Sequence, residues 1–267
     1  STYFGLAAKL FAPVSLVGVV GEDFPQEGWN LLSNTNIDVK NIQIQPGTTF
    51  RWGGRYNNDY SHRETLFTNL GVFEKFEPSI LENYKKADFL FLGNIQPDLQ
   101  LNVANQMESV KTIVCDTMNL WIDLCPDKLW DVLKRVDIFL LNDEEAVQLT
   151  AKKNLSEAAN QLLQSGPRVV VIKQGANGAL LTYDDVSVQI PVFPIKSLID
   201  PTGAGDSFAG GFIGHLVNSG SNDLIEAVIT GAAIASFTVS GFGVEGLLEA
   251  NIDSIQNRKN IIRESMK

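Results

Sequence analysis

The chain has 267 residues, of which 44% are hydrophobic and 19% are charged. These proportions exclude a disordered chain, collagen and coiled coil. The formal charge of −10, without a long run of lysine and arginine, argues against nucleic acid or an anionic membrane as a partner. The apolar runs are too short to span a bilayer, and two scattered cysteines fit a reducing compartment. We therefore expect a cytoplasmic enzyme or a binder of small molecules.

The first segment has apolar residues at helical spacing from Tyr3 to Phe11 and stops at Pro13. This pattern predicts a buried helix that proline ends. A strand is predicted directly after it, at residues 14–20. Because a fold that opens on such a helix needs a strand before it, we expect that a first strand precedes Ser1.

Short apolar runs then alternate with helical patterns along most of the chain. Strands are predicted at residues 89–92, 112–115, 137–141 and 168–173. Helices are predicted near residues 24–34, 97–109, 127–134, 143–150, 155–165, 205–218, 222–240 and 251–263. Continuous apolar strands separated by helices indicate an α/β fold with a mostly parallel sheet and helices on both faces. Ligands of such sheets bind at the carboxyl ends of the strands.

Residues 41–72 break this alternation with aromatic and polar stretches. The pair Gly53-Gly54 predicts a tight turn between two short strands. We interpret the segment as a small β lid on a single domain that spans residues 1–267; a surface hairpin without a catalytic role is the alternative. Exposed β edges pair readily with other chains, so we expect a homodimer through the lid.

The sharpest motif is Asp-Pro-Thr-Gly-Ala-Gly-Asp-Ser-Phe-Ala-Gly-Gly-Phe at residues 200–212. Gly203 and Gly205 permit a tight turn, and the helix after it directs its free amide groups back at that turn. The result is an anion pocket in which the carboxylate of Asp206 would repel a phosphate. Asp206 makes chemical sense if it takes a proton from a hydroxyl that attacks the phosphate. The alternative is an acid that complements the helix dipole.

This motif resembles the C-terminal signature of the ribokinase/PfkB carbohydrate-kinase family. Three other segments are similar to family motifs in the same order along the chain. They are Gly-Val-Val-Gly-Glu-Asp at residues 18–23, Asn-Asp-Glu-Glu at 142–145, and Lys-Gln-Gly-Ala-Asn-Gly-Ala at 173–179. The resemblance implies a ribokinase-like fold and ATP-dependent phosphorylation of a hydroxyl on a sugar or nucleoside.

The resemblance also implies catalytic roles. Asp206 would be the base, and the amides of Gly203, Ala204 and Gly205 would hold the charge of the moving phosphoryl group. These roles suit phosphoryl transfer, which depends on positioning and on charge stabilisation.

Asn142 and Glu145 match the family's Asn-x-x-Glu motif and would hold Mg²⁺ through its water shell. Spacing of three residues puts both side chains on one helix face. A capping box of the same two residues is the alternative.

On the nucleotide side, the resemblance points to a glycine loop and to a helix of small residues. Lys173, Gln174, Gly175 and Gly178 would lie along the phosphates, with Lys173 either meeting a phosphate or ending its strand in solvent. Ala232 and Ser236 would line the adenine pocket, and close helix packing is the alternative. The region of Asp200, Thr202, Ser240 and Gly243 resembles the monovalent-cation (K⁺) loop of ribokinase relatives.

Candidates for contact with the sugar or nucleoside are fewer and less specific. They are Thr2, Arg51, Asn69 and Asn94. Trp52 on the lid could stack on a ring, and the lid arginines could meet an anionic substrate. Asparagine is also favoured in turns, and a solvated aromatic lid is the alternative for the rest.

Two other enzyme classes are excluded and one rival stays open. A hydrolase with Ser207 as nucleophile needs a histidine base, and His215 lies about two turns away, or ~12 Å, on the same helix. A dehydrogenase lacks its early Gly-x-Gly-x-x-Gly motif. The rival is a non-catalytic sensor of sugars or nucleotides that keeps the kinase fold. The presence of Asp206, Asn142 and Glu145 favours catalysis.

Overall fold

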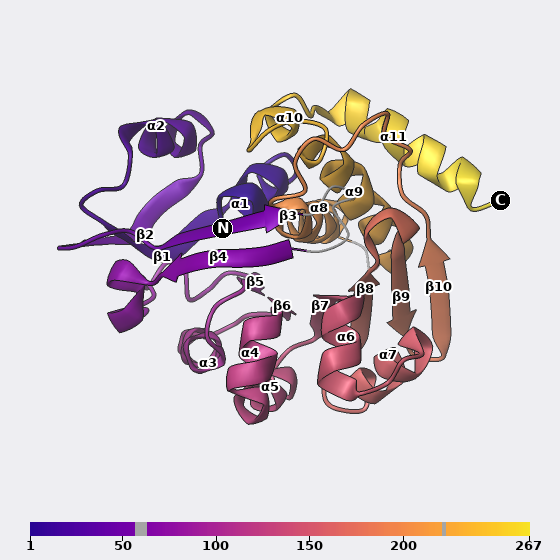
Figure 1. The fold of residues 1–267 in the computed structure, drawn as a ribbon, viewed down its shortest axis with the longest axis horizontal. Coiled ribbons are helices and arrows are strands. Elements are labelled where there is room, and N and C mark those ends of the chain that lie inside the picture. Colours follow the sequence, from indigo (N-terminus) through magenta and orange to yellow (C-terminus); the bar gives the residue numbers. More distant parts are fainter. Residues whose placement is uncertain (57–62, 221–222) are drawn as a thin grey trace. The chain divides into compact units, whose positions relative to one another are not determined.

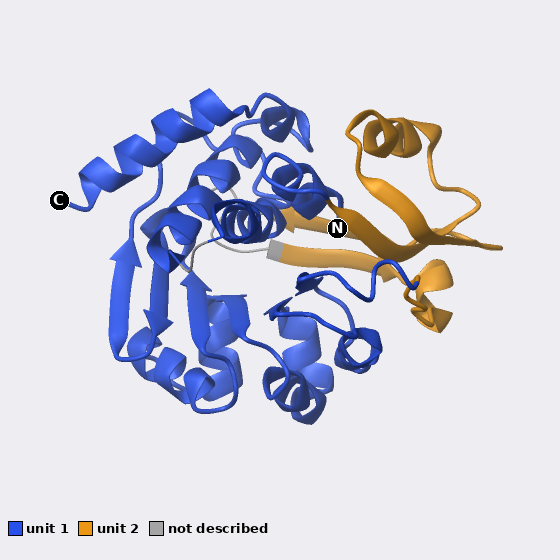
Figure 2. Cartoon of the chain, turned by 180° about the vertical axis from the view of Figure 1, so that it is seen from behind, with its two compact units in different colours: residues 1–13, 82–267 blue, residues 14–81 orange. Residues whose placement is uncertain are grey.

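The computed structural model describes residues 1–56, 63–220 and 223–267. The chain forms two compact units, one of residues Ser1–Pro13 with Glu82–Lys267 and one of residues Val14–Leu81 (Figure 2). Within the described residues, no helix combines the length and the apolar character that crossing a membrane requires.

The larger unit is built on a six-stranded sheet with the order β10-β9-β8-β7-β6-β5 (Figure 1). The strands are β5 (Phe89–Leu92), β6 (Thr112–Asp116), β7 (Ile138–Asn142), β8 (Val169–Lys173), β9 (Ala179–Tyr183) and β10 (Val186–Ile190). Strands β5 to β8 are parallel, and β9 and β10 pair antiparallel. The predicted mostly parallel α/β sheet is confirmed; the β9–β10 hairpin is an addition to it.

Strands β6, β7 and β8 are buried along nearly their whole length, because helices cover both faces of this sheet (Figure 1). One group comprises α1 (Thr2–Ala8), α8 (Ala204–Ser219), α9 (Leu224–Thr238), α10 (Glu245–Leu248) and α11 (Ile252–Ser265). The other comprises α3 (Pro97–Gln106), α4 (Asn119–Leu124), α5 (Pro126–Leu133), α6 (Asp143–Thr150) and α7 (Leu155–Leu163). The predicted helices of this unit lie within a few residues of the observed ones; α4 and α10 are additional.

Close packing of α1 and α9 against α8 fixes the position of the motif at residues 200–212. A side chain at Gly210 would come within 2.5 Å of the carbonyl oxygen of Phe4 on α1. One at Gly211 would come within 2.9 Å of Ile234 on α9. The glycines of α8 therefore let two helix backbones approach it closely.

The smaller unit contains a parallel pair, β1 (Ser15–Gly21) and β2 (Asp38–Gln45), joined through α2 (Gln26–Asn34). An antiparallel pair, β3 (Arg51–Tyr56) and β4 (Arg63–Asn69), is followed by the short 3₁₀ helix η1 (Gly71–Lys75). The predicted β character of residues 41–72 agrees with this structure, and the lid role remains a prediction.

The predicted turn at Gly53-Gly54 is wrong. Both glycines lie inside β3, where the register with β4 shifts between them. A side chain at Gly53 would meet the ring of Phe67 at 2.4 Å, and one at Gly54 the ring of Trp52 at 2.3 Å. The glycines therefore make room for aromatic rings on a bulged strand, and the connection at 57–62 lies outside the described residues.

Candidate active site

The turn that opens α8 is held in a conformation that requires glycine. Gly203 is the N-cap residue and has a φ of +79°, in the left-handed region. The ring of Tyr3 lies 2.3 Å from the position that a Cβ at residue 203 would take. The amide of Ala204 donates to the carbonyl oxygen of Pro201 at 3.2 Å, so this amide is engaged within the turn. Helix N-termini of this kind attract anions.

Asp206 lies in the first turn of α8 and is accessible from solvent. Its side chain is 34% exposed, and its Oδ2 lies 3.5 Å from the amino group of Ser1. The start of α1, which includes Thr2, therefore lies beside Asp206. A carboxylate with this exposure can be reached by a substrate hydroxyl.

Lys173, at the carboxyl end of β8, extends to the same turn. Its Nζ lies 3.4 Å from the position of a Cβ on Gly205 and 2.8 Å from Oδ2 of Asp116, at the end of β6. The two side chains are 17% and 8% exposed, and the distance is that of a charge-assisted hydrogen bond. The alternative of a solvated strand-end lysine is therefore wrong; a phosphate contact remains a prediction.

Asp116 was not among the expected site residues. Its only signal in the sequence is an acid directly after a predicted strand, at the edge of the sheet where ligands bind.

Three carboxylates act on the Lys173 ammonium. Burial lowers the pKa of Lys173, but the charges of Asp116, Glu145 and Asp206 outweigh it and raise this pKa above its ordinary value. Burial raises the pKa of Asp116, Lys173 opposes the rise, and the charge of Asp206 adds to it. When charged, these four groups carry three negative charges and one positive charge. A surplus of negative charge at this edge of the sheet favours a polyphosphate that binds together with a cation.

Asn142 and Glu145 form the capping box that was the alternative to a metal site. Oδ1 of Asn142 accepts a hydrogen bond from the amide of Glu145 at 2.7 Å, and Oε2 of Glu145 accepts one from the amide of Asn142 at 2.8 Å. Asn142 ends β7 and pairs in register with Lys173 on β8. The capping role is established, and the metal role remains a prediction.

The donor set at this edge of the sheet suits a hydrated hard cation. Across the described residues, no cluster of three or more His, Cys, Asp or Glu side chains is arranged to hold a metal ion. Mg²⁺ usually keeps several waters and takes one or two carboxylates together with substrate phosphates. Glu145 and Asn142, with the uncompensated negative charge around Lys173, fit that mode of binding.

The glycine loop after β8 is a tight turn. The amide of Gln174 donates to the carbonyl oxygen of Gly178 at 2.7 Å, and the short helix η2 (Gly175–Asn177) lies between them. Gly175 has a φ of +54° and open space around it, whereas a Cβ on Gly178 would lie 2.0 Å from the carbonyl oxygen of Ile190. Packing against β10 thus explains Gly178, and Gly175 offers open backbone to a ligand.

Ala232 and Ser236 are buried on α9, 9% and 6% exposed. The Ser236 hydroxyl donates to the carbonyl oxygen of Ala233 and accepts from Arg258 Nη1 on α11 at 2.8 Å. The guanidinium of Arg258 also lies over the ring of Phe237, 3.4 Å from its centroid. The alternative of close helix packing therefore describes Ser236 here, and adenine contact remains a prediction.

The loop that resembles a monovalent-cation site is brought together around Asp200. Its Oδ1 accepts from the amide of Thr202 at 2.9 Å, and its Oδ2 from the amide of Gly243 at 3.3 Å. Ser240 directs its hydroxyl to the carbonyl oxygen of Ser236. These contacts order the loop, and a bound K⁺ remains a prediction.

The remaining substrate candidates lie in separate units. In the larger unit, Oδ1 of Asn94 accepts from Trp121 Nε1 at 2.9 Å. In the smaller unit, Oδ1 of Asn69 accepts from the amide of Gly71 at 3.0 Å, the turn role that was its alternative.

Asp23 organises the segment that carries Arg51. Its Oδ2 lies 2.9 Å from Arg51 Nη2, and its Oδ1 accepts from both the amide and the hydroxyl of Thr49. These hydrogen bonds from Thr49 and the charge of Arg51 lower the pKa of Asp23. Arg51 is thus already paired within its unit.

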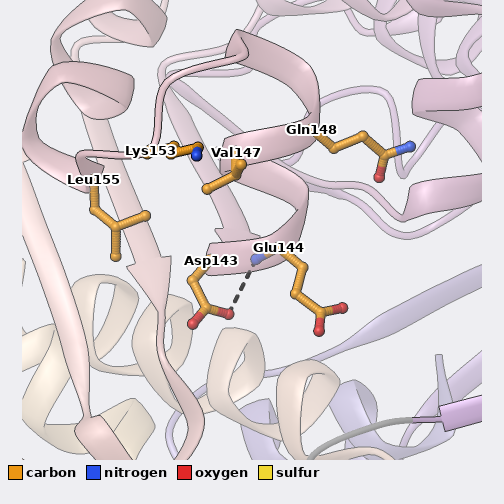
Figure 3. A pocket seen from close by; sticks show the side chains of 6 residues that line it. All are labelled: Asp143, Glu144, Val147, Gln148, Lys153 and Leu155. Carbon is orange, nitrogen blue, oxygen red and sulfur yellow. Dashed lines mark hydrogen bonds between the residues drawn. The ribbon is translucent and has the colours of Figure 1, made fainter.

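A surface pocket lies between α6 and α7 (Figure 3). It is lined by Asp143, Glu144, Val147, Gln148, Lys153 and Leu155. None of the candidate site residues lines it.

A helix N-terminus capped by a left-handed glycine, an adjacent acid and a strand-end lysine form the core of the candidate site. Comparison with known proteins shows the family of the chain. The family model of the pfkB family carbohydrate kinases matches residues 5–251. This chain belongs to that family. The kinase is accordingly a phosphotransferase that acts on an alcohol group, as the resemblance implied.

Relatives and solved structures agree with this assignment. A cytidine kinase of Thermococcus kodakarensis is 34% identical over 212 residues, which cover 78% of this chain and 75% of that protein. A deoxyribokinase of Salmonella typhi is 32% identical over 251 residues, 90% of this chain and 79% of that protein. A putative ribokinase II from E. coli, solved in complex with ATP and Mg²⁺, superposes with a TM-score of 0.82 at 20% identity, over 97% of this chain and 87% of that one. The predicted ribokinase-like fold is confirmed.

Proposed function

We propose that this pfkB-family kinase transfers the γ-phosphoryl group of ATP to a hydroxyl of a nucleoside or sugar, with Asp206 as the base. The observation that carries the proposal is the placement of Asp206 in the first turn of a helix whose N-cap is the left-handed Gly203. A proton acceptor and an anion-binding turn then lie at one helix terminus. Phosphoryl transfer needs both at the same place.

The roles of the side chains follow from this placement. Asp206 accepts the proton of the attacking hydroxyl, while the amides of Gly203, Ala204 and Gly205 stabilise the charge on the moving phosphoryl group. Lys173 supplies a positive charge beside Gly205. The Ala204 amide must leave its bond within the turn to take part.

Bound Mg²⁺ supplies the charge neutralisation that the phosphates require. Asn142 and Glu145 would hold it through water, and both lie at the carboxyl edge of the sheet. Gln174, Gly175 and Gly178 would lie along the phosphates of ATP. Ala232 and Ser236 would line the pocket for its adenine. The Asp200 loop is the candidate K⁺ site, and its carboxylate is the feature that supports it.

The substrate class is a nucleoside or a sugar, in line with the cytidine kinase and deoxyribokinase relatives. Thr2 and Asn94 in the larger unit, and Arg51 and Asn69 in the smaller, are the candidate contacts. A homodimer through the β3–β4 hairpin is supported by the exposed side chains of Leu66 and Phe67, 49% and 55% exposed.

The test is ADP release from ATP and Mg²⁺ with a panel of nucleosides, sugars and sugar phosphates. Asp206→Asn should keep the fold and ATP binding and lower kcat by at least ~10²-fold. Asp253→Asn is the matched control, because Asp253 is also a first-turn acid, on α11, and should leave kcat unchanged. Near-normal turnover by Asp206→Asn would refute the role of Asp206 as the base. ATP binding by the wild type without turnover on any acceptor would favour the non-catalytic sensor.

A further inference from the structure

We propose that Asp116 is a positioning residue of the phosphoryl-transfer site. Its carboxylate holds the Lys173 ammonium against the turn at Gly205. The proposal rests on the proposed function, since it concerns how Lys173 serves that reaction. Asp116 acts through Lys173 and does not itself contact the reacting groups.

The register of the sheet explains why Lys173 needs an anchor. Asp116 ends β6 and Lys173 ends β8, and β7 lies between these strands. Adjacent strands are ~4.8 Å apart, so the Lys173 side chain must reach across the end of β7 to meet Asp116. An unanchored lysine at a strand end would extend its charged group into water. The 2.8 Å contact with Asp116 therefore decides the direction of Lys173.

Asp116 is itself held firmly. Its Oδ1 accepts from the amide of Thr117 at 2.9 Å, while Oδ2 accepts from Lys173. Its carbonyl oxygen accepts from Nε2 of Gln100 at 3.0 Å, and the same amide group donates to the carbonyl oxygen of Gly93. Gln100 is only 1% exposed. Both carboxylate oxygens and the backbone are thus fixed, as an orienting group requires.

Stability does not account for this ion pair. Removing two charges from water costs several kcal/mol per ion, and a well-packed apolar pair is often at least as stable. The pair places a positive charge 3.4 Å from the Cβ position of Gly205, within the turn that would face the transferred phosphoryl group. Preorganised charge at that point lowers the barrier of transfer.

Burial separates the role of Asp116 from that of Asp206. Asp116 is 5% exposed, and both of its oxygens have partners, so a substrate hydroxyl cannot reach it. Asp206 is 34% exposed at the helix terminus. Asp116 is therefore the orienting acid and Asp206 the proton acceptor.

The test compares Asp116→Asn, Lys173→Met and the double variant in steady-state kinetics of the full chain. We expect Asp116→Asn to lower kcat by roughly 10–100-fold with little change in the KM for the acceptor, because a misplaced charge affects the transfer step. The double variant should match Lys173→Met within about twofold, since the effect of Asp116 passes through Lys173.

Asp137→Asn is the matched control, because Asp137 pairs with Arg168 at the opposite edge of the same sheet and should leave kcat unchanged. Wild-type kcat in Asp116→Asn, or losses that multiply in the double variant, would overturn the proposal. If Asp116→Asn does not fold, Asp116→Glu keeps the charge and displaces the ammonium, so kcat should still fall in a folded protein; wild-type kcat there would equally refute it. Failure of the proposed function is distinct, because the wild type itself would then release no ADP.

Discussion

Asn142 and Glu145 cap the N-terminus of α6 reciprocally, each side chain accepting a hydrogen bond from the backbone amide of the other. The same two side chains are the candidates for holding Mg²⁺. The two roles can be separated, because glutamine serves as well as glutamate at the third helical position of a capping box. A charge-removing substitution at that position therefore keeps the hydrogen bonds of the cap and removes the negative charge that would attract a cation.

Glu145→Gln should retain the thermal stability of the wild type and raise the Mg²⁺ concentration needed for half-maximal activity by roughly tenfold or more. The loss of the carboxylate charge is the reason, since a hard cation prefers anionic oxygen. Mg²⁺ titrations of ADP release, together with thermal melts, measure both effects on the same protein.

Asn154→Ala is the control for capping. Asn154 caps α7 by accepting from the amides of Ser156 and Glu157, and its loss should cost about 1 kcal/mol of stability. Its Mg²⁺ requirement should stay that of the wild type. An unchanged Mg²⁺ requirement in Glu145→Gln would assign Glu145 to capping alone.

The parts of the fold that the sequence predicts best are those with a long, uniform pattern. Strand β8 is apolar from Val169 to Ile172 because both of its faces are covered, and α6 has the length and cap of an ordinary helix. Helices α4 and α10, with 6 and 4 residues, are too short to show a helical period. Gly53 and Gly54 have the composition of a turn, and only the rings of Phe67 and Trp52 explain them as part of β3.

The site residues likewise fall into those that the sequence predicts and those that it does not. The turn at Gly203 with Asp206, and the cap of α6, are local in sequence, so their residue types and spacing are enough to predict them. The contact between Asp116 and Lys173 joins residues 57 positions apart and depends on the order of three strands. An acid after a strand is a common feature, so the sequence alone could not single out Asp116.

Gly203→Ala should strongly destabilise the larger unit. An L-residue with a φ of +79° costs ~1–2 kcal/mol, and the new methyl group would overlap the ring of Tyr3. Urea unfolding measures the loss, which should be at least about 1 kcal/mol. A variant as stable as the wild type would show that this turn relaxes freely.

Gly205→Ala, two residues along the same turn, should instead fold normally and lose activity. Its Cβ would have the Lys173 ammonium as its near neighbour, at 3.4 Å, and alanine is favourable within a helix. The methyl group would displace the ammonium or occupy the space of the phosphoryl group. We expect kcat to fall by about tenfold or more at unchanged stability; full activity would place the phosphoryl group elsewhere.

The dependence of stability on acid pH should be traceable to Glu226 on α9. Arg263 on α11 donates to both of its carboxylate oxygens, and Lys259 lies 3.2 Å from one of them. The hydrogen bonds from Arg263, followed by those from Lys259, lower the pKa of Glu226 to about 2, from an ordinary value of 4.5. Because this pKa is depressed in the folded state, its contribution is complete above the ordinary value and is lost as the pH falls toward about 2.

Glu226→Gln should therefore be less stable than the wild type at neutral pH, and the difference should shrink between about pH 5 and about pH 2. Thermal or urea unfolding of both proteins across this range measures the difference directly. Asp131→Asn is the control, because Asp131 pairs with Lys134 on an exposed surface, where ion pairs contribute little. If the gap between Glu226→Gln and the wild type stayed constant down to the lowest pH, the carboxylate would not be the titrating group, and the link between α9 and α11 would rest on packing alone.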